Sequence, residues 1–138
     1  MCNIIHLNLV QMTNSRQKGN MGESIACNYL QERGFTIICR NYQKKWGEID
    51  IIGEKDNLLH FFEVKSVTAR LGDDPTNSHR PEENVHALKI RHIRRVIETY
   101  LWEEHVPESK EFQVHVISVS IDNETNTSKV EMIENIII

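Results

Sequence analysis

The 138-residue chain lacks the features of membrane, secreted and zinc-ribbon proteins. No apolar run approaches the roughly 20 residues of a membrane span. Residues 1–12 have neither a basic leading region nor a small-residue cleavage site. The three cysteines are far apart and form no CxxC pair, which argues against a disulfide framework or a zinc ribbon. We therefore expect a reduced, cytoplasmic protein with no membrane partner.

Several catalytic patterns are also missing. The seven histidines are scattered without zinc-ligand spacing, and no glycine-rich phosphate loop or Ser-His-Asp arrangement stands out. The formal net charge of −4 is not the basic excess of a strong non-specific nucleic-acid binder. From Glu98 onward the only cations are Lys110 and Lys129, so the other cations are concentrated earlier and a basic face is compatible with the acidic total.

What the chain contains is an alternation of helix and strand patterns over about one domain's length. Asn20 and Glu23 form a potential capping box before an apolar helical face that ends at Gly34. After a loosely attached leader (residues 1–19), we expect a single domain over 20–138. Strands are predicted at 35–42, 48–52, 58–66, 112–121 and 129–138, with a helix from Pro81 to about His105. The order α-βββ-α-β-β predicts an α/β domain.

Two carboxylates and a lysine lie within the second and third strand patterns. Asp50 and Glu63 are equidistant from the centre of a turn at 55–57, so a hairpin would place them opposite each other. Carboxylates so placed repel unless a divalent cation bridges them. We expect Asp50, Glu63 and the Val64 carbonyl to hold Mg²⁺ or Mn²⁺ at a phosphodiester. Lys65 would orient or deprotonate the attacking water.

Each candidate also has a plain structural interpretation. Lys65 could simply form an ion pair with Asp50 or Glu63 on a solvated sheet face, and Glu23 could only cap its helix. Lys89 falls within the apolar face of the long helix, where it would either contact a phosphate or extend along the edge of the core. The cations that we expect to contact nucleic acid are Lys18, Lys44, Lys45 and Lys89.

Ordered motifs run from Lys18 to Val119 and together resemble the YraN-type family of small bacterial proteins. They are Lys18-Gly19, Gly22-Glu23, Tyr29-Leu30, Gly34-Phe35, Arg40-Asn41, Gly47-Glu48-Ile49-Asp50-Ile51-Ile52, Phe62-Glu63-Val64-Lys65, Pro81-Glu82-Glu83-Asn84-Val85, Lys89 and Tyr100-Leu101. This family is grouped with Holliday-junction resolvases in the PD-(D/E)XK nuclease superfamily.

The resemblance implies a restriction-endonuclease-like core, a mixed β-sheet flanked by helices. It implies a catalytic site at Glu23, Asp50, Glu63 and Lys65, and so raises Glu23 from a helix cap to a site residue. The implied activity is Mg²⁺- or Mn²⁺-dependent hydrolysis of DNA at branched or structured sites. A homodimer or a complex with a protein partner is compatible with this activity. Gln113 replaces an aspartate of the family pattern, which together with the acidic charge favours an alternative: a non-catalytic nucleic-acid-binding or recombination-accessory module.

Overall fold

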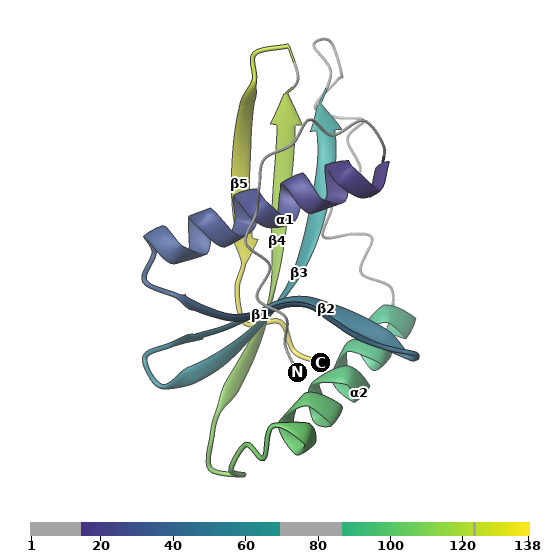
Figure 1. Ribbon diagram of the computed structural model, residues 1–138, viewed down its shortest axis with the longest axis vertical. Coiled ribbons are helices and arrows are strands. Elements are labelled where there is room, and N and C mark those ends of the chain that lie inside the picture. Colours follow the sequence, from purple (N-terminus) through teal and green to yellow (C-terminus); the bar gives the residue numbers. More distant parts are fainter. Residues whose placement is uncertain (1–14, 70–86, 123) are drawn as a thin grey trace.

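The computed structural model describes residues 15–69, 87–122 and 124–138. In these ranges the elements are α1 (Ser15–Glu32), β1 (Thr36–Lys44), β2 (Gly47–Lys55), β3 (Leu58–Ala69), α2 (Ala87–Glu103), β4 (Phe112–Asp122) and β5 (Thr127–Ile133). The strands form one sheet in the order β1-β2-β3-β4-β5, parallel only between β3 and β4 (Figure 1). This confirms the predicted α/β fold with a mixed sheet.

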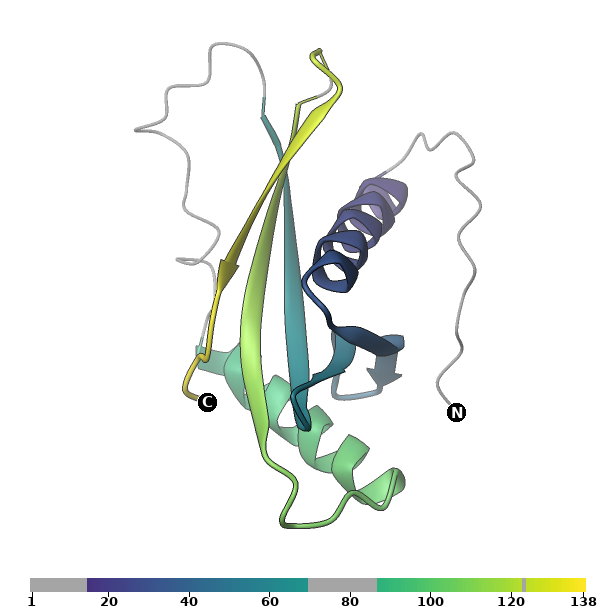
Figure 2. The same ribbon diagram turned by 90° about the vertical axis from the view of Figure 1, so that its left-hand side faces the viewer.

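The two helices cover different parts of the sheet (Figure 2). Alternate side chains of β3 point to opposite faces, so Phe62 packs with α1 residues and Phe61 packs with α2 residues. Both rings are buried, and truncating either to alanine should cost about 3–5 kcal/mol of stability. No helix in the described residues has the length and apolar composition to cross a membrane.

The end of α1 follows the sequence signal, whereas its start does not. Gly34 has a φ of 91° and donates to the Gln31 carbonyl, while Phe35 donates to the Leu30 carbonyl, which together form a Schellman motif. At the other end the helix begins at Ser15, so the prediction that Asn20 caps it is wrong. The last residues of the predicted leader, 15–19, therefore belong to α1, which begins more than one turn before the cap signal.

The β2–β3 hairpin has the predicted register. Its two-residue turn is formed by Asp56 and Asn57, both with positive φ, as a type I′ turn requires. Pairing runs from Lys55↔Leu58 to Ile51↔Phe62 and then stops, although β3 continues to Ala69 beside β4. The first residues of β2 turn away from β3 and remain paired with β1, so that both run across the direction of β3, β4 and β5 (Figure 1).

The structure describes the second predicted helix from Ala87 onward, as α2. The predicted helix start at Pro81 lies outside the described residues. On α2, Ile93, Val96, Ile97 and Tyr100 form the expected buried face. Trp102 lies on the opposite side of the helix and is 79% exposed.

Candidate active site

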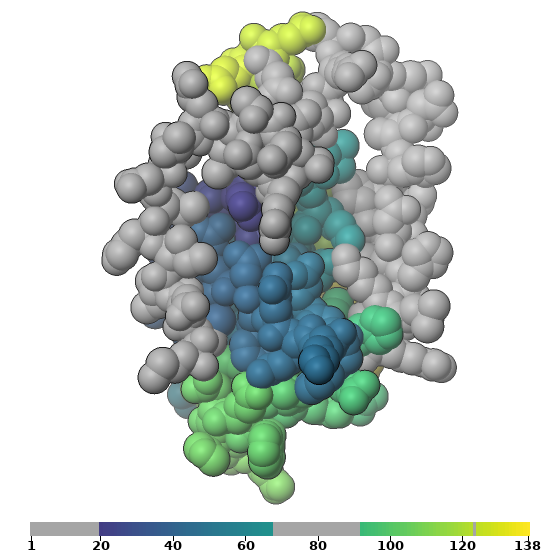
Figure 3. Space-filling view, turned by 45° about the vertical axis from the view of Figure 1, so that its right-hand side comes forward, coloured from purple at the N-terminus to yellow at the C-terminus, as the bar shows by residue number. Residues whose placement is uncertain are grey.

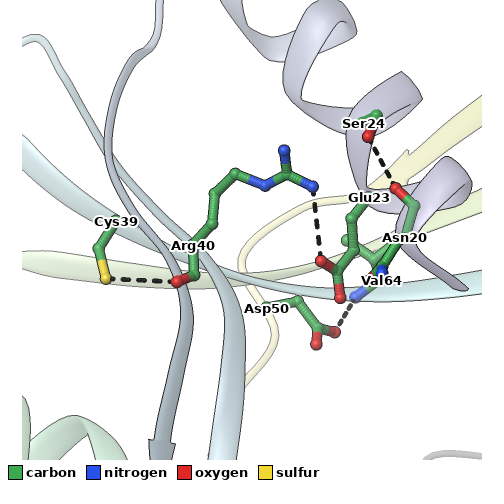
Figure 4. A network of polar contacts seen from close by, with 7 residues as sticks. All are labelled: Asn20, Glu23, Ser24, Cys39, Arg40, Asp50 and Val64. Carbon is green, nitrogen blue, oxygen red and sulfur yellow. Dashed lines mark hydrogen bonds and ion pairs between the residues drawn. The ribbon is translucent and has the colours of Figure 1, made fainter. Parts of the chain in front are cut away.

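The candidate site lies at the fork where β2 leaves β3. Asp50 and Glu63 occupy the next positions after the last pair of the ladder, Ile51↔Phe62, and both side chains are buried. Asp50 Oδ2 accepts a hydrogen bond from the Val64 amide, with an N···O distance of 2.7 Å (Figure 4). The carboxylate thus takes the place of a β2 backbone acceptor at the point where the strands separate, and it is fixed against the β3 backbone.

Helix α1 brings a third carboxylate to the fork. Gly22 packs so tightly on β3 that an added Cβ would lie 3.0 Å from the Ser66 Cβ, so any larger residue would push the helix away. This close approach places Glu23, the next residue, with its carboxylate directed at Asp50 (Figure 4). Glu23 does not cap its helix, because α1 begins at Ser15. It faces the candidate site instead, in agreement with the role that the family resemblance implies.

Arg40 of β1 is a partner of Glu23 that sequence reasoning missed. Its Nη2 lies 3.6 Å from Glu23 Oε2, and the two side chains are only 11% and 12% exposed. Within the described structure, neither Arg40 Nε nor Glu23 Oε2 has a hydrogen-bond partner. Two largely buried charged groups are therefore held together with unsatisfied atoms, and unsatisfied buried polar groups of this kind also occur at functional sites.

The charges at the fork raise the proton affinity of Asp50. Burial is the main reason why the pKa of Asp50 rises to about 7, and the charge of Glu63 is the next cause. The hydrogen bond from Val64 acts in the opposite direction, while Glu23 and Glu48 add further repulsion. Burial also raises the pKa of Glu23, against the opposing effects of Asn41 and Arg40. A positive charge placed among these carboxylates would relieve the repulsion.

Lys65 completes the predicted group of residues. Its Nζ lies 3.5 Å from Glu63 Oε1, and its side chain is partly exposed, in contrast to the buried Glu63. The ion pair of the plain structural interpretation is therefore present. The structure thus places Glu23, Asp50, Glu63 and Lys65 at a single fork, contributed by three different elements.

A divalent cation fits the chemistry of this donor set. Asp50, Glu63 and the Val64 carbonyl offer only oxygen atoms, the ligands that Mg²⁺ and Mn²⁺ prefer. Among the described residues no three His, Cys, Asp or Glu side chains lie close enough to hold a metal ion. Two carboxylates and a carbonyl suit Mg²⁺ nevertheless, because this ion usually keeps several of its waters.

The cations predicted to contact nucleic acid differ in their surroundings. Lys44 forms a short ion pair with Glu103, and its ammonium lies over the Tyr42 ring. Lys45 is exposed in the turn between β1 and β2. Lys18 and Lys89 belong to α1 and α2, and their side chains lie outside the described part of the chain.

Gln113 is remote from the fork. It pairs with His60 in the parallel ladder, whereas Glu63 pairs with Val116 three residues further on. Because side chains alternate along a strand, positions 113 and 116 face opposite sides of the sheet. The position of the missing family aspartate is therefore not a neighbour of Glu63 in the sheet.

A buried histidine pair was not foreseen. His60 Nδ1 and His115 Nε2 are 2.9 Å apart, and the Asn135 amide donates to His115 Nδ1. Burial lowers the pKa of both rings, that of His115 to about 4. The only sequence signal was one histidine in each of two strand patterns, and the parallel pairing of β3 with β4 could not be read from it.

Comparison with known proteins shows that the chain is similar to one family of bacterial proteins. A profile of the family described as "Uncharacterised protein family UPF0102" matches residues 22–119, which contain all four site residues. The chain is 43% identical to a UPF0102 protein of Helicobacter hepaticus over 89 residues, 64% of this chain and 73% of that protein. It is 36% identical to a UPF0102 protein of Campylobacter jejuni over 104 residues (75% and 84%). It is 32% identical to one of Caldicellulosiruptor bescii over 124 residues (88% and 98%). These matches confirm the resemblance found from the motifs.

Proposed function

The chain belongs to the UPF0102 family, the family of the YraN-type proteins, and from its candidate site we propose that it is a metal-dependent endonuclease that hydrolyses phosphodiester bonds in DNA. The observation that carries this proposal is the convergence at the fork. A buried Asp50, fixed by the Val64 amide, lies among the charges of Glu63 and Glu23, with Lys65 beside them.

The side chains have distinct roles in this proposal. Asp50 and Glu63 would hold Mg²⁺ or Mn²⁺, which when bound supplies Lewis-acid polarisation of the phosphate and a water of lowered pKa. Lys65, as an ammonium ion beside Glu63, would donate to a phosphate oxygen and offset the negative charge of the transition state. Glu23 Oε2 has no hydrogen-bond donor among the described residues, so it can accept one from the attacking water.

The preference for branched or structured DNA rests on the resemblance to resolvases. Such substrates are read through backbone and shape, which agrees with a site that offers carboxylates and a lysine. A homodimer is part of the proposal, because cutting two strands of a junction calls for two sites. We place the protein in the cytoplasm, where its thiols stay reduced.

The test is cleavage of linear, nicked and four-way DNA with Mg²⁺, Mn²⁺ or EDTA. We expect metal-dependent cutting by the parent and its loss in Asp50→Asn and Lys65→Ala. The matched controls are Asp122→Asn and Lys129→Ala, which change the same residue types at positions outside the fork. Unchanged cleavage by both site variants would show that the site assignment is wrong.

Arg40 favours one second candidate, a nucleic-acid-binding accessory module without catalysis. Its guanidinium already partly neutralises Glu23, so the local charge is partly balanced without a metal. This candidate predicts that the parent never cuts under any of the metal conditions, but binds four-way DNA with an affinity that falls steeply as salt is added.

A further inference from the structure

We infer that the β1–β2 turn and the neighbouring half of α2 form a contact surface for the sugar–phosphate backbone of the DNA strand that enters the fork. We call it the turn–helix surface and define it by Lys45, Trp46, His92, Arg94 and Arg95. This inference rests on the proposed function and adds to it the path of the substrate.

The turn and the helix are held together by a close backbone approach. Gly47, directly after the turn, has a φ of 155°, and an added Cβ would lie 3.0 Å from Val96 Cγ2 and 3.4 Å from His92 Cβ. Only a residue without a side chain allows α2 to come this near. Figure 3 shows the surface of β1 and β2 (blue) directly against that of α2 (green).

Arg95 lies over the Trp46 ring in a cation–π contact. The guanidinium carbon is 4.6 Å from the ring centroid. Trp46 is itself partly buried against the core cluster on the α2 side. A guanidinium over an aromatic ring still offers N–H donors, and their planar arrangement matches a phosphate. Because Arg95 covers the ring, we expect backbone contact here and no base stacking.

The cations of this surface are less neutralised than others nearby. In the described part of the chain, Lys45 and Arg95 have no carboxylate partner, whereas Lys44 is paired with Glu103. Arg94 pairs with Glu98, but both side chains are about two-thirds exposed. Exposed pairs of this kind contribute little, so a phosphate can compete for Arg94.

Charge is divided along α2, and its basic half lies beside the fork. The exposed cationic and histidine side chains are His92, Arg94 and Arg95, while Glu98 and Glu103 follow in the second half and Glu104 directly after the helix. Ile93, within the basic half, lines the same small cavity as Glu48 and Glu63. On a chain of net charge −4, the positive part of α2 is thus next to the candidate site, where it would attract a polyanion.

The spacing also suits a nucleic-acid strand. Trp46 precedes Asp50 by four residues of extended chain, roughly 13 Å at strand rise. That distance corresponds to about four base pairs of helical rise. A strand held at Lys45 and Arg95 would therefore reach the fork without sharp bending.

The chain contains two tryptophans, which gives a direct optical test. Trp102 is 79% exposed, so Trp102→Phe leaves Trp46 as the only indole at little structural cost. This protein is titrated with a single-stranded and a duplex oligonucleotide of about 16 nucleotides. EDTA is present, so that binding is measured apart from cleavage. We expect the Trp46 emission to change on binding and the affinity to fall with added salt.

Single-charge variants then test the surface itself. Lys45→Gln and Arg95→Gln should each weaken binding about 3- to 10-fold at low salt and lower the salt slope by about one. Lys129→Gln is the matched control, since Lys129 is an exposed cation on β5, at the other edge of the sheet, and it should leave the affinity unchanged. Lys45 lies in an exposed turn, so its variant should fold even if Arg95→Gln does not.

Three results would overturn the inference: no DNA binding, an unchanged Trp46 emission on binding, or an equal loss of affinity in Lys129→Gln and Lys45→Gln. The cleavage assay separates this failure from that of the proposed function. Cutting with unaltered binding in both turn–helix variants would leave the nuclease assignment intact. Binding through this surface without any cutting would support the surface and reject catalysis.

Discussion

Two buried polar groups in this molecule differ in how well their atoms are satisfied. In the histidine pair, Asn135 N–H donates to His115 Nδ1, so His115 Nε2–H donates to His60 Nδ1, and His60 Nε2–H can donate to the Lys55 carbonyl. Every ring nitrogen has a partner. At the fork, by contrast, several carboxylates crowd together, and Glu23 Oε2 and Arg40 Nε have no hydrogen bond among the described residues.

This difference in hydrogen bonding distinguishes a polar group that stabilises the fold from one that serves chemistry. A complete hydrogen-bond chain stabilises the fold because each buried polar atom is satisfied. Like charges and unpaired atoms cost stability, and such a site persists when the arrangement serves chemistry. We therefore expect substitutions at the histidine pair to reduce stability, and substitutions at the fork to reduce activity.

The largest expected effect is on catalysis. Glu63→Gln should lower the rate of metal-dependent DNA cleavage by about 10³-fold, because it removes a charged cation ligand while keeping the shape. The thermal midpoint of the variant should not fall, since the substitution also removes a repelling charge. Glu131→Gln, on the exposed face of β5, is the control and should leave the rate unchanged.

The second effect is on stability. His115→Ala should reduce the free energy of unfolding by about 3 kcal/mol, because it leaves a cavity and deprives His60 Nδ1 and the Asn135 amide of their partner. Denaturant unfolding measures this change, and cleavage per folded molecule should stay unchanged. His105→Asn, in an exposed position with a φ of 50° that asparagine tolerates, should cost less than about 0.5 kcal/mol. Equal losses in both variants would contradict a structural role for the pair.

The third effect is on pH dependence. The pKa of His115 is about 4 in the folded protein and 6.5 unfolded, so between these values the unfolded state binds a proton that the folded state does not. The contribution of His115 to stability is therefore complete above pH 6.5 and is lost as the pH falls towards 4. We expect the stability difference between the parent and His115→Ala to shrink by up to about 3 kcal/mol across this window. A constant difference would show that the pair is not neutral in the folded protein.

The smallest effect has the opposite sign. The pKa of Asp50 is raised, from 3.8 to about 7, so its charged form destabilises the fold as the pH rises through this range. Asp50→Asn should therefore be more stable than the parent at pH 8, by about 1 kcal/mol, with the gain disappearing near pH 4. Asp122 provides the contrast, since the Thr125 and Glu124 amides lower its pKa. Asp122→Asn should slightly lose stability at pH 8. A gain of stability in both variants would contradict the contrast between the two carboxylates.

The features that could be predicted from the sequence depend on residues that lie close together along the chain. Asp50 and Glu63 were expected to face each other because a tight turn fixes the register of an antiparallel hairpin, and the ladder has that register. The end of α1 at Gly34 was also expected, because a glycine in the left-handed conformation is a short-range signal.

The remaining parts depended on contacts between distant segments. The Arg40–Glu23 pair requires α1 to rest on the sheet at Gly22, and the His60–His115 pair requires β4 to lie parallel to β3 after the α2 crossover. The Asn20 cap failed because a local motif can occur inside a helix as well as at its start. Long-range pairing leaves little trace in a single sequence, whereas hairpins and caps do.

Titration of Mn²⁺ into the purified protein by calorimetry tests most directly whether the fork is a cation site. We predict binding at one site per chain that is lost in Asp50→Asn and retained in Asp122→Asn. Absence of binding to the parent, or equal binding to Asp50→Asn, would contradict the assignment of Asp50 and Glu63 as ligands.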